Sequence, residues 1–383
     1  SSHIWRRDFG LGPSWAHTLG WRIELRRQHI GVFTQHGTKV TFPLVEPGGE
    51  VLGKFGWVLR RDADGYEVDT DDGLYRRFRV VDDRTAVLVL VRARNPTAIA
   101  LSYDAGGALA LVTDSAGRRI RVRCGEHGHI ASFTFEPESG DPIVLARYEY
   151  DETGRLARAI DADGHAGAYA YNQRNQLILD RDRAGLSFHF VFDDAGRCVE
   201  SWGDYGEAPD PSLADGKPAF LHDGKTPCKG IHHCVFEWGA DGYSSVVDST
   251  SDARFFGNEH GLVDKRVDGG AVTTATYRPD GHIASLSDGE GATTVLERDR
   301  RGHVTKVIDP LGRVEAIERD GFGLPVRAVD AAGNVTRWRR DARGNVLEEL
   351  DASGGLTLFE IDPRGLVTKI TDRNSAVTRF AYD

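Results

Sequence analysis

The sequence lacks several features that usually mark a membrane protein or a disulfide-bonded secreted domain. It has four cysteines in 383 residues, no methionine, and no run of 18 consecutive apolar residues. Small secreted scaffolds are much richer in cysteine, and a transmembrane helix needs a longer apolar stretch. Because even position 1 is not methionine, we interpret the sequence as part of a longer protein.

Positive charge is also in deficit. The chain carries 48 Lys and Arg against 58 Asp and Glu, which gives a net charge of −10 and a pI of about 5.8. Non-specific binding to nucleic acid requires clustered Lys and Arg, whereas arginines here are scattered and often stand beside acidic residues, as Arg340 does beside Asp341. We therefore expect no nucleic-acid binding by this chain, and no membrane span.

What the sequence does have is a series of regularly spaced glycines, which we call the beat. From Gly281 to Gly365 a glycine returns at alternating intervals of ten and eleven positions, so the true unit is a pair of segments. Gly291 and each later glycine of the series follow an aspartate by three positions, while Arg278 takes that place before Gly281. The predicted turn residues are Asp299, Gly302, Asp309, Gly312, Asp320, Gly323, Asp330, Gly333, Asp341, Gly344, Asp351, Gly354, Asp362 and Gly365.

An Asp-x-x-Gly pattern is typical of a type I turn followed by a left-handed glycine. Such turns join antiparallel strands, and the segments between them, such as 303–308 and 334–339, are rich in β-branched and aromatic residues. The chain is thus predicted to be a run of consecutive β-hairpins. The same beat fills most of the chain from residue 100 onward, for example at Asp104–Gly107, Asp114–Gly117, Asp151–Gly154, Asp161–Gly164, Asn172–Asn175, Asp182–Gly185 and Asp193–Gly196.

Other repeat folds have other periods. Propeller blades repeat at about 40–45 residues, and calcium-binding β-helices use a glycine-rich nonapeptide. The turn aspartates could also be acid/base pairs or calcium ligands, but each recurs at the same position with its own glycine, which favours the turn interpretation. Both faces of a strand such as 334–339 mix polar and apolar residues, whereas a sandwich strand would separate them.

The beat breaks after Trp202, and residues 203–235 are predicted to form an irregular insert. It contains a candidate metal site made of Cys228, His232, His233 and Cys234, with His222 upstream. Thiolates and imidazoles are good zinc ligands, but the paired spacing of a zinc finger is missing. A Cys228–Cys234 disulfide and two free thiols remain alternatives. A zinc hydrolase would also need a general base, for which Glu237 is the nearest carboxylate, so we predict neither a cofactor nor catalytic residues.

The recurring motifs resemble the tyrosine-aspartate (YD) repeat of Rhs proteins. They include Tyr150-Asp-Glu-Thr-Gly-Arg-Leu156, Phe192-Asp-Asp-Ala-Gly-Arg197, Asp309-Pro-Leu-Gly-Arg313 and the closing Ala381-Tyr-Asp383. The stretches at 19–21, 37–43, 57–65 and 72–78 resemble the segment that opens the Rhs repeat region. Asp362-Pro-Arg-Gly-Leu366 matches the pattern of the Rhs self-cleaving region, but another repeat follows it, so we interpret it as a repeat turn.

This resemblance implies an all-β fold in which consecutive antiparallel hairpins form one spiralling sheet, part of a hollow cocoon. We divide the chain into an N-terminal β-rich segment at 1–99, repeats at 100–202, the insert at 203–235 and repeats at 236–383. The implied function is that of a shell segment, itself not an enzyme, around the protein's own C-terminal toxin domain.

The resemblance also implies partners and a location. The partners would be that toxin, an N-terminal plug or chaperone, a secretion spike protein and an immunity protein. The protein would be made in the bacterial cytoplasm and exported by a specialised route such as type VI secretion, for competition between bacteria. The alternatives are an extracellular adhesion or carbohydrate-binding repeat protein and, more remotely, a zinc enzyme at 222–237.

Overall fold

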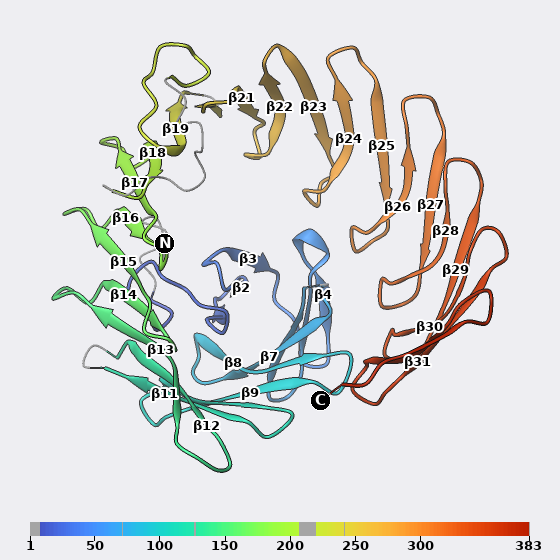
Figure 1. Ribbon diagram of the computed structural model, residues 1–383, viewed down its shortest axis with the longest axis horizontal. Coiled ribbons are helices and arrows are strands. Elements are labelled where there is room, and N and C mark those ends of the chain that lie inside the picture. The colour runs from blue at the N-terminus through green and yellow to red at the C-terminus, as the bar shows by residue number, and fades with distance from the viewer. Residues whose placement is uncertain (1–7, 71, 126–127, 207–219, 241, 383) are drawn as a thin grey trace.

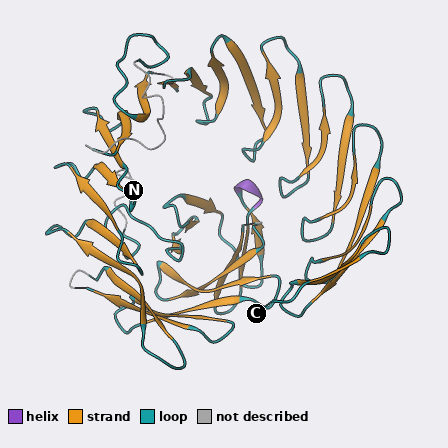
Figure 2. Ribbon diagram, in the orientation of Figure 1, coloured by secondary structure: helices purple, strands orange, loops and turns teal. Residues whose placement is uncertain are grey.

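The computed structural model describes residues 8–70, 72–125, 128–206, 220–240 and 242–382. They form one sheet of 33 strands that curls round into a nearly closed ring, with β2, β3 and β4 inside it (Figure 1). Strands and loops make up almost all of the structure, and the only helical element described is a short 3₁₀ turn, η1 (Figure 2). None of the described residues forms a helix that could cross a bilayer. The predicted all-β fold is confirmed.

The strands are short and evenly spaced along the chain. The first part of the sheet consists of β1 (Arg22–Leu25), β2 (Ile30–Phe33), β3 (Lys39–Phe42), β4 (Glu50–Leu52), β5 (Val58–Arg61), β6 (Gly65–Asp69), β7 (Leu74–Val80) and β8 (Thr85–Ala93), and η1 (Lys54–Gly56) connects β4 to β5. The next part consists of β9 (Ala98–Tyr103), β10 (Leu109–Asp114), β11 (Arg119–Cys124), β12 (Ile130–Glu136), β13 (Ile143–Tyr150), β14 (Leu156–Asp161), β15 (Ala166–Tyr171), β16 (Leu177–Arg181), β17 (Ser187–Phe192) and β18 (Cys198–Asp204).

The remaining strands follow the insert. They are β19 (Ile231–Trp238), β20 (Tyr243–Val247), β21 (Asp252–Gly257), β22 (Val263–Asp268), β23 (Ala271–Tyr277), β24 (Ile283–Asp288), β25 (Thr293–Arg298), β26 (Val304–Ile308), β27 (Val314–Arg319), β28 (Pro325–Val329), β29 (Val335–Arg340), β30 (Val346–Leu350), β31 (Leu356–Ile361), β32 (Val367–Thr371) and β33 (Val377–Arg379). β9 spans the boundary that we placed after residue 99, and the four-part division stays a prediction.

From β4 to β33 each strand pairs antiparallel with the next one along the chain. The sheet forks at β8. Its first residues pair with β1, where Thr85 lies opposite Glu24, and its later residues pair with β9, where Leu90 lies opposite Ala100. The β1–β3 hairpins thereby fold back over β4–β9.

This fold-back supplies most of the apolar core. The largest core cluster contains Trp21, Ile23, Phe42, Leu59 and Phe78 among others, and its last buried member along the chain is Leu101. Among the described residues, the last buried hydrophobic side chain is Ala253. From there on the wall is one sheet thick and its strands are only half-buried, as in β26, β28, β30 and β32. This agrees with the mixed faces seen in the sequence.

The turns at the two edges of the wall differ. Turns at Gly281, Gly302, Gly323, Gly344 and Gly365 follow a register shift in the strand pair that they join, and we call them the bulge row. Turns at Gly291, Gly312, Gly333 and Gly354 join strands with no shift, and we call them the plain row. A β-bulge bends its strand and increases the local twist. Bulges at only one edge, once in every two-segment unit, therefore favour a wall that curves continuously.

The residue just before most bulge-row turns, and before their counterparts earlier in the chain, links successive hairpins. The Tyr171 hydroxyl donates to the Leu156 carbonyl at 2.8 Å, and the Tyr103 hydroxyl donates to the Leu88 carbonyl at 2.7 Å. Arginine does the same further on, since Arg340 Nε donates to the Pro325 carbonyl at 3.0 Å. Each acceptor lies 15 residues earlier. This contact gives the tyrosine of the repeat its physical role, which is to hold one hairpin against the previous one.

Candidate functional site

The two ends of the curved sheet meet at a seam. Arg94, in the loop between β8 and β9, donates from Nη2 to the Phe322 carbonyl at 2.9 Å, and Asn95 Nδ2 donates to the Arg364 carbonyl at 3.2 Å. These partners are 228 and 269 residues apart in sequence. The Arg94 guanidinium also lies over the Phe322 ring, 5.5 Å from its centroid. A local loop near the start of the sheet is thereby joined to two turns near its end.

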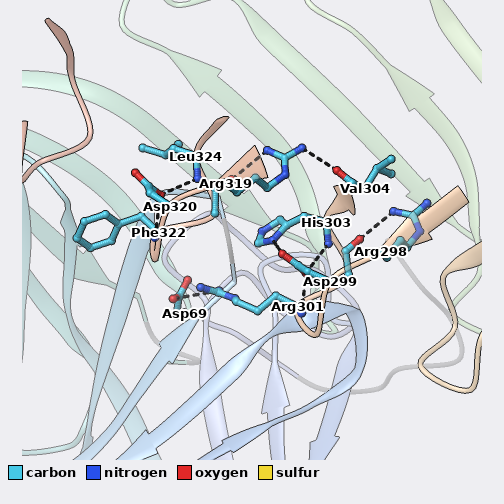
Figure 3. A network of polar contacts seen from close by, with 12 residues as sticks. Asp69, Arg298, Asp299, Arg301, His303, Val304, Arg319, Asp320, Phe322 and Leu324 are labelled. Carbon is cyan, nitrogen blue, oxygen red and sulfur yellow. Dashed lines mark hydrogen bonds and ion pairs between the residues drawn. The ribbon is translucent and has the colours of Figure 1, made fainter. Parts of the chain in front are cut away.

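A second contact of the seam is an ion pair (Figure 3). Arg301 Nη2 lies 3.1 Å from Asp69 Oδ2, at the end of β6. The Asp69 side chain is only 5% exposed and that of Arg301 22%. Next to it Gly56 packs directly on the Arg301 carbonyl, because a Cβ at Gly56 would lie 1.8 Å from that oxygen. Gly56 has φ +73°, so both space and backbone conformation require glycine there.

Hydrogen bonds within the turn hold Arg301 in place. Asp299 Oδ1 accepts from the N–H groups of Arg301 and His303, and His303 Nδ1 lies 2.7 Å from Asp299 Oδ2 (Figure 3). Burial by itself would raise the pKa of Asp299, but the hydrogen bonds from His303 and the turn amides outweigh it and hold that pKa below its ordinary value. Arg298 Nη1 closes the turn by donating to the Gly302 carbonyl at 2.8 Å.

The seam uses equivalent positions of the repeat. Arg301, Phe322 and Arg364 each lie two residues after the turn aspartate of a bulge-row turn. The spacing of the repeat alone would have placed these positions on one edge of the sheet. Their partners Asp69 and Asn95 lie outside the repeat pattern, so nothing in the sequence signalled the contact itself.

The predicted turn residues all lie at the edges of the wall. In each turn the glycine N–H donates to the carbonyl of the turn aspartate, and the N–H of the aspartate donates to the carbonyl of the residue four positions after it. All of these glycines have φ between +77° and +93°. Asp309 shows the shared pattern, since its Oδ1 accepts from the N–H groups of Leu311 and Arg313. Asp362 makes the same turn, and β32 follows it.

The four candidate metal ligands lie in or just before β19, and residues 207–219 of the predicted insert lie outside the described residues. All four cysteines are free thiols, so the structure contains no Cys228–Cys234 disulfide. Cys228 is buried, His233 is buried and His232 is exposed with φ +49°. In the described part of the chain, only Asp161, Asp163 and His165 form a group of three ligand atoms within 4.8 Å. The metal site at the insert stays a prediction.

His233 is instead part of a clasp between β18 and β19. Its Nε2 lies 3.0 Å from Glu200 Oε1, and its Nδ1 accepts from the Lys229 N–H at 3.2 Å. Glu200 Oε2 also pairs with Lys229 Nζ at 2.6 Å, and that ammonium lies over the Trp202 ring. Both ring nitrogens of His233 are thus engaged by protein groups. Glu200, which lies well upstream of the predicted ligands, was not predicted from the sequence to contact them.

One further group could be considered for catalysis. Asp8, His17 and Cys124 line the same open cavity beneath the N-terminal segment. Burial raises the pKa of the Cys124 thiol, with a smaller contribution from Asp104, and burial lowers the pKa of His17. A nucleophilic cysteine needs the opposite shift, towards thiolate. His17 Nε2 is moreover held by the Phe9 carbonyl at 2.8 Å. This arrangement favours a packing role.

Comparison with known families places the repeats. Residues 319–356 match the family model described as RHS Repeat. That segment runs from the end of β27 to the start of β31 and includes the linking residues Arg319 and Arg340. The chain therefore contains an Rhs repeat. The predicted resemblance is confirmed, and the turn pattern outside the matched segment shows that hairpins of the same kind continue over most of the sheet.

Two curated relatives of this chain come from Dickeya dadantii. "Probable deoxyribonuclease RhsB" is 28% identical over 145 residues, 37% of this chain and 10% of the relative. "Probable deoxyribonuclease RhsA" is 25% identical over 203 residues, 52% of this chain and 14% of the relative. The chain therefore corresponds to only a small part of these proteins, and the nuclease activity in their names belongs to those proteins.

Two solved structures also match this chain. The TcdB2-TccC3-TEV crystal structure does so at 14% identity and a TM-score of 0.44, over 84% of this chain and 19% of that one. The Tc holotoxin pore of Photorhabdus luminescens matches at 12% identity and a TM-score of 0.32, over 96% of this chain and 22% of that one. The fold described above rests on the strand pairing of the chain itself.

Proposed function

We propose that this chain is a segment of a shell that encloses a C-terminal toxin domain of the same protein until delivery to a target cell. Its role in this proposal is steric, and the chemistry belongs to the enclosed domain. The observation that carries the proposal is the seam, where the Arg94 and Asn95 loop is hydrogen-bonded to turns 228 and 269 residues later. A wall whose first part is joined by these contacts to turns near its end surrounds an interior.

The construction of the wall supports the same function. A single sheet from β22 to β33 gives a large enclosed surface for few residues, and its strands are half-buried or exposed, as expected without a second layer. Antiparallel pairing of each strand with the next from β4 to β33 also leaves few open sheet edges, which otherwise promote aggregation. Delivery would require the wall to open or the enclosed domain to leave through it.

The remaining parts of the proposal concern partners and location. A plug or chaperone at the N-terminal side, a spike protein of a type VI or similar secretion system and an immunity protein would act with the shell. The protein would be made in a bacterial cytoplasm and exported for use against competing bacteria. The Rhs repeat supports these steps, together with the names of the curated relatives, since a deoxyribonuclease would harm the cell that makes it unless it were kept enclosed or inhibited.

The test is limited proteolysis of the natural protein followed by mass spectrometry. We expect this chain to co-purify with a separate or cleavable C-terminal polypeptide that resists protease while the wall is intact. The double variant Arg94→Ala, Asn95→Ala should make that polypeptide accessible to protease. A free chain without a passenger, combined with saturable binding to glycans or cells, would contradict the proposal and favour the adhesion alternative.

A further inference from the structure

A lane of side chains with one large apolar residue in every two-segment unit runs across one face of the repeats. Leu296, Ile317, Trp338 and Phe359 each lie three residues before the turn aspartate of a bulge-row turn, so one recurs in every two-segment unit. Directly opposite them, on the neighbouring strands, are Val307, Ala328, Glu349 and Ile370. Residues opposite each other in a sheet share a face, so these eight side chains form one continuous lane.

The same face carries aromatic residues at the equivalent positions in the first half of the wall. Tyr148 and Tyr169 also lie three residues before the first residue of a turn. Tyr169 and Leu296 lie on the same face of the sheet, because directly paired residues share a face and so do residues two positions apart in one strand. The path between them from β15 to β25 runs through Asp180, Phe188, Phe190, Ser201, Cys234, Phe236, Val246, Ala253, Phe255, Arg266, Thr273, Ala275, Leu286 and Thr294.

In that first half the lane is already covered by polypeptide. Residues 8–20, which we call the strap, cross the strands β12 to β15. The Trp15 ring packs against Tyr169 with 4.6 Å between ring centroids and a tilt of 57° between the ring planes, and its Nε1 donates to the Tyr171 hydroxyl at 2.6 Å. His17 meets Phe133 edge-on at 6.4 Å. Gly12 packs so closely on the Gly154 carbonyl that a Cβ would lie 2.7 Å from it.

The strap approaches the wall from inside the ring, where its dark-blue trace leads on to β2 (Figure 1). The lane is therefore on the concave face. In the second half of the wall the lane residues are half-exposed, and none of them belongs to either of the two core clusters found among the described residues. The strap thus shows how this face binds a chain, and β25 to β32 carry the same face without it.

We propose that the lane from Leu296 to Ile370 binds an extended segment of the enclosed polypeptide, anchored by an aromatic side chain as the strap is anchored by Trp15. This inference rests on the proposed function, since the enclosed domain supplies the segment. The site continues an interface that the protein already forms with its own strap. Trp338 is the central contact, and its Nε1 is fixed by Glu349 Oε2 at 2.9 Å, which leaves the ring to stack on the segment.

The first test uses this chain alone, with a fluorescent peptide of residues 8–20 as the probe. We expect saturable binding, which a Trp15→Ala peptide weakens at least about fivefold because it lacks the partly buried aromatic anchor. Trp338→Thr and Phe359→Thr in the chain should weaken binding comparably. Leu358→Thr is the matched control, since Leu358 is the neighbour of Phe359 on the opposite face and is 39% exposed. Equal effects of Phe359→Thr and Leu358→Thr on peptide affinity would contradict binding at the lane.

The second test uses the natural protein with a photo-crosslinking phenylalanine analogue at position 338 or, as control, at 358. We expect cross-links from position 338 to polypeptide outside residues 1–383, centred near aromatic residues, and none from position 358. If the enclosed polypeptide is protected from protease but position 338 does not cross-link to it, the proposed binding at the lane is contradicted while the proposed shell function stands. If no polypeptide is enclosed, the shell proposal fails, and with it the proposed occupant of the lane. Specific peptide binding in the first test would then still identify the lane as a peptide-binding surface.

Discussion

The ion pair between Asp69 and Arg301 gives the sharpest test of how the wall is closed. The pair links β6 to the turn between β25 and β26 over 3.1 Å, and the two side chains are unequally buried, at 5% exposure for Asp69 and 22% for Arg301. Removing one partner of a buried pair typically costs about 3–5 kcal/mol because a charge is left behind in a poorly solvated place. The cost should therefore depend on which charge is left.

We expect Arg301→Gln to be the more damaging change, because it leaves the Asp69 carboxylate almost without access to water. Its effect should be about 3 kcal/mol on the stability of the seam. Asp69→Asn leaves the Arg301 guanidinium, which is partly solvated, and should cost about 2 kcal/mol. In a double-mutant cycle the coupling energy should be about 2 kcal/mol, since the two groups are in direct contact.

The assay is native-state hydrogen exchange of amides in β6 and in the turn 299–303, together with chemical denaturation. Arg300→Gln is the matched control, because Arg300 is exposed in the same turn and a surface change of this kind costs about 0.5 kcal/mol or less. A coupling energy below about 0.3 kcal/mol, or an Arg301→Gln variant no weaker than Arg300→Gln, would refute the role of this pair in closing the wall.

The hydrogen bonds of the turns and of the hairpin links carry four more predictions. Tyr171→Phe should cost about 1 kcal/mol in thermal unfolding, because the hydroxyl both donates to Leu156 and accepts from Trp15, while Tyr169→Phe should cost less; equal losses would contradict the linking role. Gly302→Ala should destabilise the protein more than Gly312→Ala. Both positions have positive φ and would share a strain of about 1–2 kcal/mol, but only at 302 would the new Cβ meet the His282 ring, at 2.3 Å. The comparison is made by thermal melts of the two variants followed by circular dichroism. The pKa of Asp299 is below its ordinary value, so its contribution to stability is present above the unfolded pKa of about 3.9 and is lost as pH falls through the folded value. The melting temperature of Asp299→Asn should therefore change less than that of wild type between about pH 5 and pH 2. Parallel curves of melting temperature against pH for the two proteins would contradict this prediction. Cys228→Ser and Cys234→Ser should leave the metal content unchanged in elemental analysis, because both nitrogens of His233 are already engaged. Stoichiometric zinc that is lost in either variant would instead support the predicted metal site.

Strand positions were predictable from the beat almost to the residue. The segments expected at 303–308 and 334–339 are strands at Val304–Ile308 and Val335–Arg340. The shift of one residue at their start has a physical reason. The turn aspartate accepts a hydrogen bond from the N–H four positions on, as Asp299 does from His303, and so keeps that residue within the turn.

The insert was less predictable. β18 extends to Asp204 and β19 begins at Ile231, so both strands reach into the predicted irregular segment. Loss of the turn pattern signals a long connection but gives no information on where pairing resumes. Pairing there is accompanied by the Glu200, Lys229 and His233 clasp, which joins positions far apart in the sequence and leaves no periodic trace.

The two-segment unit explains why the two edges of the wall have different roles. In the described part of the chain, bulge-row turns reach the N-terminal strands and loops: Arg301 meets Asp69, Phe322 meets Arg94, and a Cβ at Gly344 would lie 3.9 Å from Arg94 Cδ. At Gly291, Gly312, Gly333 and Gly354 of the plain row, a Cβ would meet nothing within 4 Å. The bulge that accompanies one row of turns, and not the other, bends the sheet and so brings that row round to the N-terminal strands. The curvature of the wall and its closure thus have one cause, which lies in the difference between alternate hairpins.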